Sequence, residues 1–152
     1  MTIATYEDLI EWTRQSHHHL AELLSDDNAS VPEHRVQWLL TYLADHERAL
    51  EKTVADFETQ MPSRTLKTWM YNYLSTRPIS ASPQQGRSFS TMTFEEICKA
   101  VFAVHSQIIA VYKDLASRAD LPEAASIFGS LLSLEEHEAM RMATQIARSA
   151  DL

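Results

Sequence analysis

The sequence predicts an all-α fold in a single domain spanning residues 1–152, and three observations carry this prediction. Only two of the 152 residues are glycine, whereas a sheet protein of this length needs many tight turns of the kind that glycine favours. Four long segments place apolar residues three and four positions apart, which is the spacing of an amphipathic helix. The first two of these segments also match the last two in sequence.

The first two helices are predicted over residues 5–26 and 32–61. Thr5 and Asp8 have the spacing of a capping box, which marks the start of the first helix. Pro62 ends the second helix. The residues expected to face the core are Tyr6, Leu9, Ile10, Thr13, Leu20 and Leu24 in the first helix, and Val36, Leu39, Leu43, Leu50, Val54, Phe57 and Met61 in the second.

The last two helices are predicted over residues 93–119 and 121–149, and Thr93 with Glu96 forms a second capping box. A crossover over residues 62–92 precedes them. It is rich in proline and serine and contains one short helix. An up-down-up-down bundle needs only a short connection at this point. We therefore expect the second and third long helices to run parallel, with the crossover travelling the length of the bundle.

An internal repeat relates the two halves of the chain. The first six residues of the first helix match those of the third at an offset of 88, and the same offset relates His17 to His105. The second and fourth helices match at offsets of 90 and 91, and the latter aligns Glu47 with Glu138. The repeat predicts one helical hairpin used twice.

Each predicted helix places at least one potential metal ligand on its apolar face. A buried, unpaired carboxylate is unfavourable, so inward carboxylates and imidazoles need either hydrogen bonds to one another or a divalent cation. This ligand set suits iron, manganese or zinc. The predicted ligands are His17, Glu47, His105 and Glu138, and His46, His137 and Glu135 are further candidates for a larger site.

This arrangement resembles the ferritin-like four-helix bundle of rubrerythrins and bacterioferritins. That family places a glutamate on the first and third helices and an E-x-x-H motif on the second and fourth. His17 and His105 stand in the first two places, and Glu47 and Glu138 look like the glutamates of the two motifs. The residue three positions after each glutamate is not histidine, so both motifs are degenerate. The resemblance implies a bound divalent metal, with iron favoured over manganese or zinc, and redox chemistry on oxygen or peroxide.

Two other interpretations remain open. The degenerate motifs favour a metal-free ferritin-like scaffold that acts through dimerisation or a partner protein, in which the inward histidines and glutamates form a hydrogen-bonded network. Hemerythrin-like oxygen carriers also use histidine and carboxylate ligands in a four-helix bundle. They rank third, because the connection between the second and third helices is too long for them.

Composition excludes several other classes of function. The net charge of −8 argues against binding to nucleic acid or to an anionic membrane. A lone cysteine, Cys98, leaves no intrachain disulfide and no cysteine zinc site. No uncharged apolar run approaches the roughly 20 residues that cross a bilayer, and no signal peptide is visible. We therefore expect a cytoplasmic protein with neither a nucleic-acid nor a membrane partner.

Aromatic residues outside the core stripes predict a homodimer. Trp38, Tyr42 and Ala49 form a second stripe on the helix over residues 32–61, and Trp69, Tyr71 and Tyr73 add aromatic surface in the crossover. Apolar patches larger than a few hundred Å² seldom remain exposed on a monomer.

Overall fold

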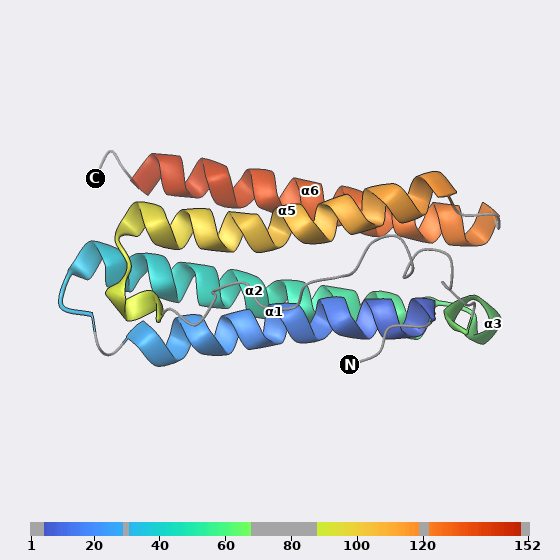
Figure 1. Ribbon diagram of the computed structural model, residues 1–152, viewed down its shortest axis with the longest axis horizontal. Helices are drawn as coiled ribbons and strands as arrows, with labels where there is room; N and C mark the ends of the chain where they lie inside the picture. The colour runs from blue at the N-terminus through green and yellow to red at the C-terminus, as the bar shows by residue number, and fades with distance from the viewer. Residues whose placement is uncertain (1–4, 29–30, 68–87, 119–121, 150–152) are drawn as a thin grey trace. The chain divides into compact units, whose positions relative to one another are not determined.

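The computed structural model describes residues 5–28, 31–67, 88–118 and 122–149, and every regular element in these ranges is a helix (Figure 1). The chain divides into two compact units, residues 1–90 and 91–152. The all-α prediction is confirmed. The single domain, the ferritin-like bundle and the parallel course of the second and third long helices stay predictions.

The first unit is a helical hairpin of α1 (Tyr6–Asn28) and α2 (His34–Gln60), followed by the short helix α3 (Ser63–Leu66). The predicted capping box starts α1. The backbone N–H of Thr5 donates to Oδ2 of Asp8, and the N–H of Asp8 donates to Oγ1 of Thr5, both at 3.2 Å. These two bonds satisfy donors that the first helical turn leaves without backbone partners.

The helices α1 and α2 lie side by side and run in opposite directions (Figure 1). Their buried apolar residues follow the predicted stripes, except that Phe57 is only half-buried. The helix α2 begins two residues later than predicted, after the extended residue Glu33. It ends at Gln60, because Met61 precedes a proline and adopts the extended conformation that this position favours.

The second unit is a hairpin of α5 (Phe94–Arg118) and α6 (Pro122–Ser149), and the 3₁₀ turn η1 (Phe89–Thr91) precedes it. The second capping box forms as predicted between Thr93 and Glu96, with N–H donors at 3.1 and 3.2 Å from the side-chain oxygens. The helices α5 and α6 also run side by side in opposite directions (Figure 1). The ring of Tyr112 on α5 packs against that of Phe128 on α6, with centroids 5.8 Å apart.

The two hairpins repeat each other at a single offset of 88 residues. The helix starts follow it, since α1 and α5 begin 88 residues apart and so do α2 and α6. Buried side chains follow it too, in the pairs Leu40 and Phe128, Leu43 and Leu131, and Val54 and Met142. The larger offsets read from the sequence for the second helix of each hairpin are therefore wrong as a structural alignment.

The crossover is described only at its ends. The short helix predicted there corresponds in part to α3, and residues 68–87, with Trp69, Tyr71 and Tyr73, lie outside the described residues. None of the described helices is long and apolar enough to cross a membrane.

Candidate metal centre

A buried histidine–carboxylate pair joins the two helices of the first hairpin. His17 lies on α1 and Glu47 on α2, and both side chains are completely inaccessible to solvent. Nδ1 of His17 is 2.6 Å from Oε2 of Glu47. An ionised carboxylate can only accept, so Nδ1–H donates in this bond. The two predicted ligands of this hairpin therefore meet, and they form a short, charge-assisted contact.

Apolar side chains flank this pair along both helices. Leu20 lies one turn from His17, and Leu43 and Leu50 lie one turn on either side of Glu47, and all three are buried. Such surroundings lower the local dielectric, which strengthens a satisfied polar contact and makes a broken one costly. The hydrogen-bonded pair is therefore an integral part of the hairpin core, and breaking it would be unfavourable.

A second pair occupies the core of the second hairpin. His105 on α5 is 1% exposed and Glu135 on α6 is fully buried. Nδ1 of His105 is 3.6 Å from Oε2 of Glu135, which is beyond hydrogen-bonding distance but within reach of an ion pair. Within the second hairpin, a carboxylate that faces His105 thus belongs to Glu135.

Glu138 does not take the place that the sequence suggested for it. Its side chain is 18% exposed and pairs with Arg141, with Oε1 at 3.2 Å from Nη1. Glu135 and Glu138 are three residues apart and share a helix face, so the periodicity alone could not separate them. The two are separated by their position along α6 relative to His105. Counting residues from Pro122 placed the position level with His105 almost one turn too far along α6.

The two buried pairs are equivalent by the internal repeat. His17 and His105 are 88 residues apart, and so are Glu47 and Glu135. Applying the offset of the two histidines to the carboxylates would have identified Glu135 from the sequence. The same polar pair is therefore built twice, at the same level of two similar hairpins.

The remaining candidates lie elsewhere. His46 is half-buried on α2, and its ring lies 6.1 Å from that of Tyr42, centroid to centroid. His137 is exposed on α6.

The spacing within each pair can be compared with the requirements of a metal ion. An ion with ligands at 2.0–2.2 Å holds a nitrogen and an oxygen about 3.0 to 3.4 Å apart, depending on the ligand–metal–ligand angle. The separation of 3.6 Å between His105 and Glu135 is close to that range. The separation of 2.6 Å between Nδ1 of His17 and Oε2 of Glu47 is that of a direct hydrogen bond. It would have to increase by a few tenths of an ångström if both atoms ligated one ion. Imidazole and carboxylate together fit iron, manganese and zinc.

Comparisons with known proteins give no relative: no family model, no curated protein and no solved structure matches the chain.

Proposed function

We propose that the protein binds a divalent transition-metal ion through its buried histidine–carboxylate pairs. One observation carries this proposal: a fully buried His17–Glu47 pair has an equivalent, His105 and Glu135, at the same level of the second hairpin. A core of apolar side chains would be simpler to build at these positions, since burying ionisable groups is unfavourable unless they are paired or ligate a metal. A function that needs these groups explains why they occur twice.

Iron is the metal we favour, with manganese and zinc as alternatives. Support comes from the mixed nitrogen and oxygen ligands and from the resemblance of the repeated hairpins to ferritin-like proteins. Bound iron would supply redox chemistry on oxygen or peroxide. The chain's own contribution would be two imidazoles and two carboxylates in apolar surroundings that limit the access of water.

The competing proposal is a metal-free scaffold that acts through self-association. The short bond between His17 and Glu47 favours it, because that pair is satisfied without an ion. Trp38 favours it as well, since this large apolar side chain is 41% exposed on α2 and stacks on Tyr42 at a centroid distance of 5.3 Å. We propose that this aromatic face forms a homodimer, with or without metal in the core.

Elemental analysis of protein purified without chelators tests the metal proposal. We expect a metal to co-purify with the wild type and to be lost in the double variant His17→Ala, His105→Ala. The variant His137→Ala is the matched control, because it removes an exposed histidine of α6 and should keep the metal. Helical circular dichroism shows whether the double variant is folded. A folded double variant with undiminished metal content would refute the proposed site, and a wild type without metal would leave the scaffold as the function.

A further inference from the structure

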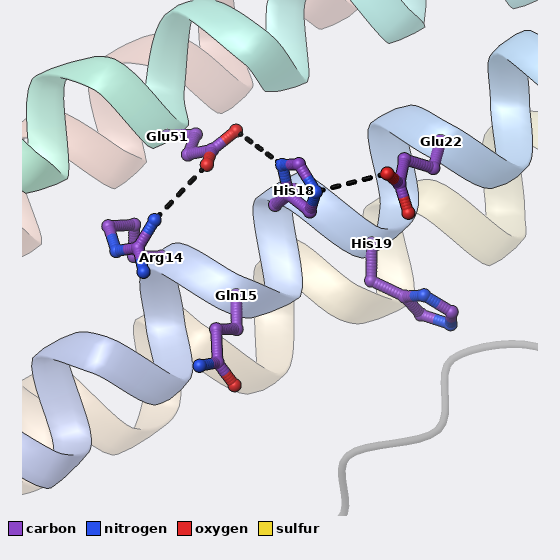
Figure 2. Close-up of a pocket in the computed structure, with 6 residues that line it drawn as sticks. All are labelled: Arg14, Gln15, His18, His19, Glu22 and Glu51. Atoms are coloured by element: carbon purple, nitrogen blue, oxygen red, sulfur yellow. Dashed lines mark hydrogen bonds and ion pairs between the residues drawn. The ribbon is translucent and has the colours of Figure 1, made fainter.

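A shallow pocket on the outside of the first hairpin is lined almost entirely by charged and imidazole side chains. Figure 2 shows His18 between two glutamates, Glu51 of α2 and Glu22 of its own helix. The residues that line the pocket are Arg14, Gln15, His18, His19, Glu22 and Glu51. None of them belongs to the buried pairs described above.

Both ring nitrogens of His18 face a carboxylate. Nδ1 lies 3.0 Å from Oε2 of Glu51, and Nε2 lies 3.1 Å from Oε1 of Glu22. Glu51 is itself held in place, because Nη1 of Arg14 lies 3.3 Å from its other oxygen. Arg14 is in turn fixed by Glu11, whose carboxylate accepts from Nε at 2.9 Å. Arg14 and Glu51 therefore form a chain of contacts on one side of the imidazole.

This is the geometry of a histidine prepared as a metal ligand. In metal sites the ligating histidine usually donates its other ring N–H to a carboxylate, which fixes the tautomer and orients the ring. Glu51 is placed to accept from Nδ1–H, and in the metal-free protein Nε2 can donate its own proton to Glu22. A divalent cation would displace that proton and take its place between Nε2 and the carboxylate of Glu22. The distance of 3.1 Å between Nε2 and that oxygen lies within the range of about 3.0 to 3.4 Å that one ion imposes on two of its ligands.

We propose that His18 and Glu22 chelate a divalent cation such as Zn²⁺ in this pocket, with Glu51 orienting His18. The two ligands are four residues apart on α1, so they share one face of the helix. His19 adds a further imidazole to the pocket wall, and water completes the coordination. The site is solvent-facing, so its ion exchanges readily, unlike one held in the core.

The second hairpin serves as an internal control for this proposal. At the offset of 88 residues, the six pocket positions become uncharged and none is histidine: Phe102, Ala103, Ser106, Gln107, Ala110 and Ala139. The repeated fold therefore forms without this cluster, whereas it keeps the buried pair. The polar cluster is a property that the first hairpin has in addition to the fold.

The alternative is a network of surface ion pairs without a ligand, and zinc titration separates the two. We expect wild-type protein, followed by calorimetry with Zn²⁺ alone, to bind one exchangeable equivalent. The variants His18→Gln and Glu22→Gln should lose it, and Glu51→Gln should weaken it by about tenfold or more, the effect typical of a residue that orients a ligand. His34→Gln removes an exposed histidine outside the pocket and should bind zinc as the wild type does.

Nuclear magnetic resonance of the imidazole nitrogens gives a readout that does not depend on counting equivalents. Zinc should shift Nε2 of His18, while Nδ1 keeps its proton. Zinc binding unchanged in both His18→Gln and Glu22→Gln, or a zinc shift confined to Nδ1, would overturn the proposal. The outcome is independent of the core pairs, because metal that co-purifies and is lost with His17 and His105 reports on those pairs alone.

Discussion

The contact between His17 and Glu47 shows how much one buried polar pair can depend on both partners. Removing one of the two side chains would leave the other in apolar surroundings without this partner, which typically lowers the free energy of unfolding by several kcal/mol. Removing both leaves a cavity but no orphaned charge. The pair should therefore behave as a unit in mutational experiments.

A double-mutant cycle in metal-free buffer tests this expectation. We predict that Glu47→Ala lowers the free energy of unfolding by about 3 kcal/mol or more. His17→Ala should also be destabilising, and the double variant should lose less than the sum of the two, with a coupling of about 1–3 kcal/mol. Chemical denaturation measures all four free energies. Strict additivity would contradict a direct interaction between the two side chains.

His18 should make stability depend on pH, again in metal-free buffer. The hydrogen bond to Glu51 and the negative charge of that carboxylate raise the pKa of His18 above its ordinary value. A raised pKa means that the folded state binds the proton more tightly. The resulting stabilisation is present below the ordinary pKa of about 6.5 and is lost as pH rises through the raised value.

The measurement is the difference in stability between the wild type and His18→Gln at about pH 6 and at about pH 9, on either side of the His18 titration. The wild type should be the more stable by a few tenths of a kcal/mol at the lower pH, and this difference should shrink at the higher one. The effect is small because the side chain is half exposed and solvent screens the pair. A difference that grows with pH would contradict the assigned contact.

At the scale of a helix, the position of a glutamate along α6 determines whether its carboxylate is buried next to His105 or lies near the surface. Glu135 is fully buried opposite His105, whereas Glu138 lies near the surface with Arg141. We predict that Glu135→Ala destabilises the protein by about 2–4 kcal/mol, since it leaves His105 without this partner. Glu138→Ala, the matched control one turn away, should cost less than about 1 kcal/mol. Denaturant titration compares them, and equal losses would refute the assigned level.

The two capping boxes should each stabilise the start of a helix. Thr93→Ala removes the hydroxyl that accepts from the N–H of Glu96, and we predict a loss of about 1 kcal/mol in the free energy of unfolding. Thr144→Ala is the control. That hydroxyl donates to the carbonyl of Met140 in its own helix, so alanine should be neutral or slightly stabilising there. Thermal denaturation of both variants gives the comparison.

Local signals in the sequence predicted the helices better than the register between them. The starts of α1 and α5 were predictable because a capping box involves only four consecutive residues, as in Thr5 and Asp8. The buried stripes were predictable because helical periodicity fixes a face. The glutamate that faces His105 was not predictable, because the alignment of α6 along α5 depends on where the turn between the two helices is centred. An error of about one helical turn in that alignment selects Glu138 instead of Glu135.

At the scale of the whole chain, the constant offset separates the features that both hairpins share from those that only one hairpin has. Capping boxes, buried apolar positions and the His–Glu pair recur 88 residues apart, so they belong to the repeated unit. The pocket around His18 and the stacked aromatic pair of Trp38 and Tyr42 do not recur, since the latter positions become Ser126 and Ser130. Features found in only one hairpin are therefore not required by the repeated fold, and they are candidates for a role in addition to that of the shared pairs.

The exposed side chain of Trp38, which stacks on Tyr42, leads to a prediction about association. Burying Trp38 against a second copy removes a large apolar surface from water, which favours a dimer. We predict a sedimentation mass of twice the 17.3 kDa of one chain for the wild type. Trp38→Glu should restore the single mass, because a charge would have to be buried at the interface. Met140→Glu is the control, since Met140 is 71% exposed on α6 and lies outside this aromatic pair. A wild type that remains at the single mass at high concentration, or a dimer that survives Trp38→Glu, would show that this face does not hold two copies together.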